Sequence, residues 1–201
     1  MGIEAINPAT GELIQRYAET EETEVVRAIE TAHELHLEWR ETDFQHRAAL
    51  MHQAARILRD RAREFGELMT LEMGKPITGA VQEAEKCAWV CDYYADNAED
   101  FLRDQEVESD ATRSFVTFQP LGVVLAVMPW NFPFWQVFRF AAPNLMAGNA
   151  GLLKHASNVP GCALAIEEVF REAGFPEGLF RTLLIGSSRV DGVIEHPLVR
   201  A

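Results

Sequence analysis

Asn131 stands between two prolines in the Pro-Trp-Asn-Phe-Pro segment at 129–133, and an amide held in this way suits oxyanion chemistry. The segment follows an apolar run at 123–128, which is typical of a strand covered on both faces. Because ligands of open parallel sheets bind outside the carboxyl ends of the strands, we expect Asn131 at a ligand crevice. A rigid N–H donor there would stabilise a developing oxyanion. A structural turn in which Asn131 bonds its own backbone explains the pattern equally well.

Two cationic side chains fall in comparable places. Lys154 ends the next apolar run, 151–154, so we expect it at the same crevice, where it can donate to a ribose or a phosphate. Arg139 lies in the helix expected after Pro133, one turn beyond Trp135, and no carboxylate is close to it in sequence. A partly buried guanidinium group favours a planar anion such as a carboxylate ligand. The simple alternatives are a strand-end lysine that extends to solvent and an arginine that pairs with an acid elsewhere in the fold.

Other residue types that carry chemistry are less well placed. The three cysteines have no zinc-like spacing, and the glycines at 148–151 and 186–188 do not form G-x-G-x-x-G, so we predict no metal site and no usual dinucleotide fingerprint. The residues interpreted as structural or solvent-facing are Cys87, Cys91, Cys162, His33, His36, His46, His52, Glu83, Glu85 and Glu99.

The balance of charges limits the partners of the protein. Its 201 residues include 31 Asp and Glu against 18 Lys and Arg, for a formal net charge of −13. This argues against nucleic acid, whose phosphates demand clustered cations, and against an anionic membrane surface. No apolar run reaches the roughly 18 residues of a membrane-spanning helix, and the first residues lack the layout of a signal peptide. We therefore expect a cytoplasmic protein without nucleic-acid or membrane partners.

The elements that must position these residues change in character along the chain. Apolar spacings of three and four predict a mostly helical region over 1–105. The expected helices cover 24–40, 44–60, 65–73 and 77–103. Strict alternation at 113–120, within a strand segment at 106–122, predicts a half-buried strand. From 123 to 201 strands and helices alternate, with a third strand at 179–185. The predicted fold is α/β, a helical N-terminal region followed by a partial doubly wound parallel, Rossmann-like sheet.

The motifs together resemble those of the aldehyde dehydrogenase superfamily. The Pro-Trp-Asn-Phe-Pro segment and Lys154, 23 residues beyond Asn131, carry the resemblance. So do Asn-Pro-Ala-Thr-Gly-Glu at 7–12 and Leu-Glu-Met-Gly-Lys-Pro at 71–76. The similarity covers essentially all 201 residues. Within the superfamily, the Leu-Leu-Lys-His-Ala segment is similar to that of shorter bacterial succinate-semialdehyde dehydrogenases. The resemblance identifies residues 1–201 as the N-terminal part of an NAD(P)-binding domain.

The resemblance implies roles for individual residues. Asn131 would donate its amide to the oxyanion of a thiohemiacetal, an interaction typically worth about 3 kcal/mol of barrier. Lys154 would bind the adenosine ribose, and His155 replaces the proline that most relatives carry next. The implied cofactor-binding residues are Met128, Pro129, Trp130, Lys154, His155, Ala156 and Ser157.

Ser157 and Arg139 imply the cofactor and the substrate class. NAD-selective relatives carry a glutamate at the position of Ser157, and that carboxylate would repel a 2′-phosphate by about 4 kcal/mol at 4 Å for an effective dielectric constant near 20. Serine removes this repulsion, so we expect NADP to be preferred and NAD to be possible. Arg139 occupies the place of the arginine that binds the distal carboxylate in semialdehyde-specific relatives, and Trp135 would form an apolar wall of that pocket.

The implied enzyme oxidises succinate semialdehyde to succinate, and its nucleophilic cysteine and general-base glutamate belong to later parts of the family sequence. We therefore expect the catalytic domain to lie outside these 201 residues and the chain alone to be inactive. The complete enzyme would be a homo-oligomer, a dimer or a tetramer. One alternative is an aldehyde dehydrogenase of broader specificity with Arg139 engaged by an internal acid. Another is a non-catalytic fragment or binding protein on the same fold.

Overall fold

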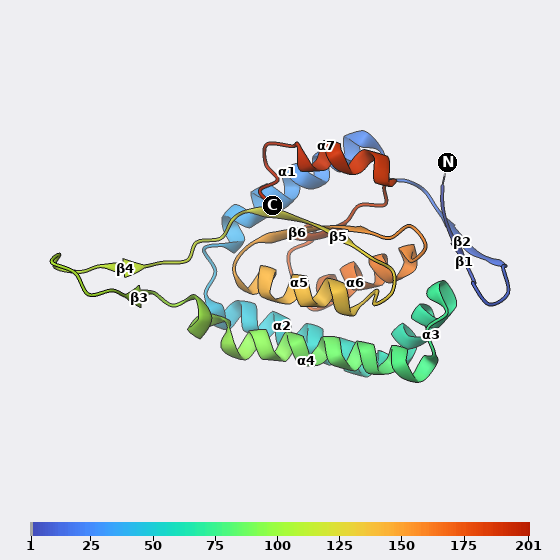
Figure 1. The fold of residues 1–201 in the computed structure, drawn as a ribbon, viewed down its shortest axis with the longest axis horizontal. Helices are drawn as coiled ribbons and strands as arrows, with labels where there is room; N and C mark the ends of the chain where they lie inside the picture. Colours follow the sequence, from blue (N-terminus) through green and yellow to red (C-terminus); the bar gives the residue numbers. More distant parts are fainter. Residues whose placement is uncertain (1) are drawn as a thin grey trace.

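The computed structural model describes residues 2–201, and Figure 1 shows the order of its elements. The helices are α1 (Glu22–Trp39), α2 (Phe44–Asp60), α3 (Ala62–Met73), α4 (Ile77–Leu102), α5 (Trp135–Met146), α6 (Pro160–Glu172) and α7 (Val190–Ile194), with the 3-10 turn η1 (Ser187–Arg189) before α7. The strands are β1 (Ile3–Ile6), β2 (Leu13–Tyr17), β3 (Gln105–Glu106), β4 (Phe115–Val116), β5 (Val123–Met128), β6 (Ala150–His155) and β7 (Phe180–Thr182). Within residues 2–201 no helix combines the length and the apolar character that crossing a membrane requires.

The central sheet is parallel, and the order in which its strands are added reverses at β5. Its strands follow the order β5, β6, β7. The chain then returns to the other side of β5, where Arg200 N–H donates to the Val123 carbonyl at 2.8 Å and Leu125 N–H donates to the Ala201 carbonyl at 2.7 Å. Residues 199–201 thus pair in parallel with the edge of β5 that β6 does not occupy. This order is the classic Rossmann order, whose switch point lies at the carboxyl end of the first strand. The predicted fold class is confirmed.

The sheet lies between unequal helical layers (Figure 1). Helix α1 covers one face, and α5 and α6 cover the other. Helices α2, α3 and α4 form a further layer outside α5 and α6. The β5–α5 crossover is therefore buried on its outer side by α4, and a side chain on the inner face of α4 can contact the start of α5.

Local signals place the ends of several helices. Asp43 caps α2 by accepting a hydrogen bond from His46 N–H at 2.7 Å. Helix α3 ends at Gly74, whose φ of 74° is the left-handed conformation that favours glycine. Pro160 begins α6. At this position the backbone N–H of any residue has no partner within the helix, so proline loses no helical hydrogen bond. The expected helix at 44–60 agrees with α2 at both ends, and the other expected helices agree within a few residues.

Two side chains at the corner between α1 and α2 donate hydrogen bonds to the carboxyl end of α5. The Trp39 indole N–H donates to the Leu145 carbonyl at 2.9 Å, and the Arg47 guanidinium donates to the Met146 carbonyl at 2.8 Å. These carbonyls belong to the last turn of α5, where the Leu145 carbonyl also accepts from Gly148 N–H at 3.0 Å. The helical N-terminal region is thereby tied to the Rossmann-like part by donors that satisfy buried backbone groups.

His36 differs from its expected place on a helix surface. It is only 4% exposed, and its Nδ1 lies 2.9 Å from the Gly148 carbonyl. Burial lowers the pKa of His36, so the neutral ring donates this bond through Nδ1–H. The interpretation failed because Gly148, 112 residues away, supplies the acceptor.

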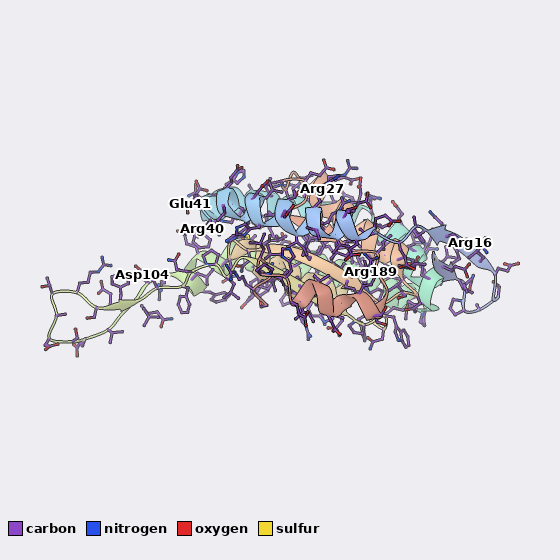
Figure 2. All side chains as sticks on the ribbon, turned by 90° about the horizontal axis from the view of Figure 1, so that it is seen from above. Arg16, Arg27, Arg40, Glu41, Asp104 and Arg189 are labelled. Atoms are coloured by element: carbon purple, nitrogen blue, oxygen red, sulfur yellow. The ribbon has the colours of Figure 1, made fainter. Side chains whose placement is uncertain are left out.

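The strand predictions were less accurate than the helix predictions. Of the expected half-buried strand at 113–120, only Phe115–Val116 forms a strand, and both residues are exposed. They pair with Gln105–Glu106 in a hairpin that projects away from the helices beyond Asp104 (Figures 1 and 2). Alternation therefore does not mark a buried face here, because no element within residues 2–201 covers the hairpin. The third sheet strand, expected at 179–185, is confined to Phe180–Thr182.

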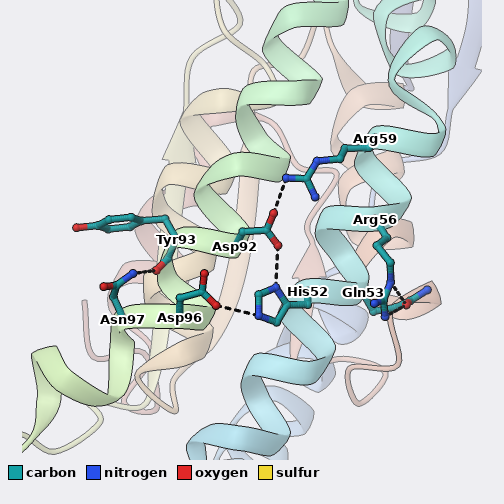
Figure 3. Close-up of polar contacts among 8 residues, drawn as sticks. All are labelled: His52, Gln53, Arg56, Arg59, Asp92, Tyr93, Asp96 and Asn97. Atoms are coloured by element: carbon teal, nitrogen blue, oxygen red, sulfur yellow. Dashed lines mark hydrogen bonds and ion pairs between the residues drawn. The ribbon is translucent and has the colours of Figure 1, made fainter.

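Charged side chains join α2 to α4 at the outer surface (Figure 3). His52 on α2 contacts two carboxylates of α4, with Nδ1 2.7 Å from Asp92 and Nε2 3.1 Å from Asp96. Arg59, two turns along α2, binds the second oxygen of Asp92. Partial burial opposes ionisation of Asp92, but the hydrogen bonds from His52 and Arg59 outweigh it and lower the pKa of this carboxyl group.

This contact predicts a pH-dependent contribution to stability. Replacing Asp92 by asparagine should lower the free energy of unfolding by about 1 kcal/mol at pH 7. Because the folded pKa lies below the ordinary value of 3.8, the difference should persist at every pH above that value and disappear as the pH falls through the folded pKa. Denaturant unfolding at several pH values measures it. Asp96→Asn, which removes a more exposed carboxylate, should cost less than about 0.5 kcal/mol. A cost for Asp92→Asn that stays constant down to low pH would contradict the assignment.

Candidate functional site

The loop at 129–133 leaves β5 at the switch point and presents Asn131 to its surface. Asn131 is exposed, and no hydrogen bond within residues 2–201 joins its side chain to its own backbone. The alternative of a self-bonded turn asparagine is therefore not what the structure contains. Its neighbour Trp130 is 51% exposed, and α5 begins at Trp135. The amide of Asn131 is free to donate to a ligand at the strand ends.

A buried ion pair holds the residues that follow Asn131. The Glu83 carboxylate on α4 accepts hydrogen bonds from the backbone N–H groups of Phe134 and Trp135, each at 2.9 Å. Its second oxygen pairs with Lys75, whose ammonium nitrogen lies 3.7 Å from the centroid of the Phe132 ring. Glu83 thus caps the start of α5 and carries the negative charge that a helix N-terminus favours. The Lys75–Glu83 pair fixes the backbone immediately after Asn131.

The sequence interpretation missed Glu83 and placed it on a solvated helix face. The residue is buried on α4. A signal was present, because Ala80, Ala84 and Cys87 lie three before, one after and four after it and mark the buried face of the helix. An acid within such a face requires partners. The neighbouring Glu85 is exposed as expected.

Lys154 and His155 end β6 and point to opposite faces of the sheet. Lys154 is 7% exposed and takes part in none of the ion pairs among residues 2–201. Burial lowers the pKa of its ammonium group. Since no fully buried side-chain nitrogen or oxygen of residues 2–201 lacks a partner, the ammonium head keeps contact with solvent while its stem is buried. Lys154 therefore offers donors that the described chain does not use.

His155 connects the ends of the two strands. It is 6% exposed, and its Nε2 lies 2.9 Å from the Pro133 carbonyl. Its Nδ1 accepts a hydrogen bond from Ala156 N–H at 2.8 Å, which assigns the proton to Nε2. Burial lowers the pKa of His155, although the bond to Pro133 acts in the opposite direction. The ring is therefore neutral and donates to the loop that carries Asn131.

Beyond β6 the chain opens onto the surface. Ser157 is exposed and lines an open groove of about 680 Å³ together with Asn158, Gly186 and two acids, Glu4 and Glu19. The nearby N-terminus of α6 is already occupied, because the buried Glu72 carboxylate accepts the N–H groups of Gly161 and Cys162 at 2.8 and 2.9 Å. An anionic group that binds at this edge must therefore use side chains such as Lys154 and Ser157.

Trp135 and Arg139 share one side of α5. Trp135 is half-buried, and the Lys86 ammonium nitrogen of α4 lies 3.9 Å from its ring centroid. Arg139 was expected to be partly buried, but it is exposed and donates to Gln136 Oε1 at 3.0 Å. Among residues 2–201 no acid pairs with it, so the described chain contains no internal partner for its charge.

The three cysteines are unsuited to nucleophilic chemistry. Cys87, Cys91 and Cys162 are buried, and burial raises the pKa of each thiol. They agree with their interpretation as structural residues. Residues 2–201 contain no group of three or more His, Cys, Asp or Glu side chains arranged for a metal ion.

Known proteins share both the sequence and the fold. The model of the aldehyde dehydrogenase family matches residues 1–201. A probable succinate-semialdehyde dehydrogenase [NADP(+)] of Synechocystis sp. is 58% identical over the whole chain, which spans 44% of that protein. Succinate-semialdehyde dehydrogenase [NADP(+)] 1 of Mycobacterium tuberculosis is 48% identical over the whole chain, which spans 45% of it. The chain thus spans less than half the length of these relatives.

The fold comparison gives a similar result. The crystal structure of succinic semialdehyde dehydrogenase from Streptococcus pyogenes, in complex with NADP+, superposes with a TM-score of 0.95 at 39% identity. The superposition covers 98% of this chain and 44% of that one. The partial Rossmann-like unit therefore occurs in larger proteins with the same arrangement of elements.

The buried ion pair predicts a large and specific loss of stability. Glu83→Gln leaves Lys75 buried without a carboxylate, so the free energy of unfolding should fall by about 3 kcal/mol. Denaturant unfolding measures the change. Glu85→Gln, two residues away on the exposed side of α4, is the matched control and should cost less than about 0.5 kcal/mol. Equal costs for the two variants would show that the pair does not hold the start of α5.

Proposed function

We propose, because the chain belongs to the aldehyde dehydrogenase family, that it supplies part of an enzyme that oxidises succinate semialdehyde to succinate with NADP. The observation that carries the proposal is the exposed Asn131 side-chain amide at the switch point of the sheet. Within residues 2–201 this amide makes no hydrogen bond to its own backbone. The names of the Synechocystis and Mycobacterium relatives support the substrate and the cofactor.

Asn131 is the proposed catalytic residue of this part of the enzyme. When a thiolate adds to the aldehyde carbonyl, negative charge develops on the oxygen, and the Asn131 amide N–H donates to it. The amide is held in place before the reaction, so it costs little reorganisation at the transition state. The buried thiols of Cys87, Cys91 and Cys162 do not serve as the nucleophile. The nucleophilic cysteine and the general-base glutamate are therefore proposed to lie outside residues 2–201.

The cofactor is proposed to bind along the ends of β5 and β6. Bound NADP would accept the hydride of the substrate. Lys154 fits its adenosine ribose because its ammonium group has unused donors on a largely buried side chain, and Ser157 fits a 2′-phosphate because it adds a hydroxyl and no negative charge. Met128, Pro129 and Trp130 would line the nicotinamide side, and the backbone at His155 and Ala156 completes the cofactor edge.

The substrate carboxylate is proposed to bind Arg139. This guanidinium group is exposed and has no acid partner among residues 2–201, so it can form a charge-assisted pair with a planar anion. Trp135 would form the apolar wall beside it, and Lys86 against the indole adds positive charge to the same side of α5. A carboxylate-bearing aldehyde is therefore favoured over an uncharged one.

We also propose that the enzyme is cytoplasmic and assembles into a homo-oligomer, a dimer or a tetramer. The projecting β3–β4 hairpin supports an assembly, because it exposes apolar side chains without any covering layer. These side chains are Val107, Phe115, Val116 and Phe118.

The Arg139 assignment predicts a change in specificity. In the polypeptide that carries this chain together with the catalytic cysteine, Arg139→Ala should raise KM for succinate semialdehyde about 10- to 100-fold. KM for an uncharged aldehyde should change less than about 2-fold, because no charged pair is lost there. Steady-state kinetics with both substrates, followed by NADPH absorbance, tests this. Equal effects on both aldehydes would refute the anchor assignment.

The Ser157 assignment predicts a change in cofactor preference. Ser157→Glu places a carboxylate where the 2′-phosphate is proposed to lie, so the ratio of Kd for NADP to Kd for NAD should rise at least about 10-fold. Ser157→Gln is the matched control, because glutamine is nearly the same size as glutamate but uncharged, and it should change the ratio of the two Kd values much less. Fluorescence titration with each dinucleotide measures the two Kd values. A ratio that glutamate leaves unchanged would show that Ser157 does not face the 2′ position.

A further inference from the structure

We propose that His155 is a positioning residue that orients the Asn131 amide by fixing the far end of its loop. The inference rests on the proposed role of Asn131 as oxyanion donor, and it assigns His155 a task besides lining the cofactor edge. The imidazole of His155 lies between the two loops that follow β5 and β6.

The sheet places His155 beside the start of the loop. In the parallel register His155 lies opposite Met128, the last residue of β5. Its imidazole then reaches Pro133, at the end of the same loop, with Nε2 2.9 Å from the carbonyl oxygen. The loop at 129–133 is thus fixed just before its first residue, at Met128, by strand pairing and at its last residue by His155. Asn131 is the central residue of the segment between these two points.

The carbonyl is the only backbone group by which Pro133 can be held. Proline has no N–H, so this end of the loop can be hydrogen-bonded only through the carbonyl oxygen. His155 supplies the donor, and its other ring nitrogen accepts from Ala156 N–H at 2.8 Å. Because both nitrogens are engaged and the ring is 6% exposed, the imidazole cannot turn without breaking one of two buried hydrogen bonds.

Glu83 and His155 act on consecutive parts of the backbone. Glu83 binds the N–H groups of Phe134 and Trp135 from α4, whereas His155 binds the carbonyl of Pro133 from the sheet. The residues after Asn131 are therefore held from two layers of the fold. Loss of the His155 bond would leave the loop free to shift while the helix start stays capped, and a shift of about 1 Å at a reacting centre can cost about 10²-fold in rate.

A double-mutant cycle in the polypeptide that carries the catalytic cysteine tests the proposal. His155→Phe keeps a ring but has no donor, and it should lower kcat about 10- to 100-fold in the presence of Asn131. In the Asn131→Ala background the same change should lower kcat less than about 2-fold, because there is no amide left to orient. His155→Gln, which retains a donor, should recover most of kcat. His33→Phe on α1 is a control for replacing a histidine and should leave kcat unchanged.

The result that overturns the inference is an equal loss of kcat from His155→Phe in both backgrounds, or no loss in either. Hydrogen exchange gives a readout without activity. In His155→Phe, the Gln136 amide, which donates to the Phe132 carbonyl in the loop at 3.1 Å, should exchange at least about 10-fold faster while β6 amides keep their protection. Unchanged exchange of the Gln136 amide also overturns it. Asn131→Ala itself should lower kcat about 10²- to 10³-fold. If it does not, the proposed function fails first, and the two failures are thereby distinguished.

Discussion

The Glu83 carboxylate, buried between α4 and the start of α5, is the interaction on which the site depends. It accepts two backbone N–H groups of the first turn of α5 and pairs with Lys75, and Lys75 in turn lies against Phe132. An unpaired charge in this place would cost several kcal/mol, so the three contacts must form together. Because the loop with Asn131 leads directly into this turn, the helical N-terminal region determines where the amide of Asn131 stands.

In this chain of net charge −13, the cationic side chains differ in whether an acid pairs with them. Many arginines form ion pairs on the surface, as Arg59 does with Asp92 and Arg61 with Glu64 and Glu172. Lys154 and Arg139 have no acid partner among residues 2–201, and both lie beside the β5–α5 loop or on α5 itself. The acid that an anionic ligand would have to displace is absent there, whereas the α6 N-terminus already holds Glu72. An anionic ligand would thus find unpaired cations at Lys154 and Arg139.

The sequence predicted the Rossmann-like series and the helices well, because apolar periodicity and the caps Asp43 and Gly74 are local signals. It also placed Asn131 and Lys154 at the carboxyl ends of neighbouring strands, and in the structure Asn131 follows β5 whereas Lys154 is the last but one residue of β6. It was wrong on the alternating segment at 113–120, where β4 pairs with an exposed strand and meets no second layer. Alternation records two faces of a strand but does not say whether either face is covered.

What the sequence by itself determined is the order of elements and the residues at the strand ends, because these depend on neighbours within a few positions. Only the tertiary structure decided which polar groups are buried and what they bind. Glu83 meets Phe134 N–H across 51 residues, and His36 meets the Gly148 carbonyl across 112. His155 and Pro133 are 22 residues apart and meet because β5 and β6 pair in register. Such contacts depend on how layers pack, and no local pattern of residue types specifies that packing.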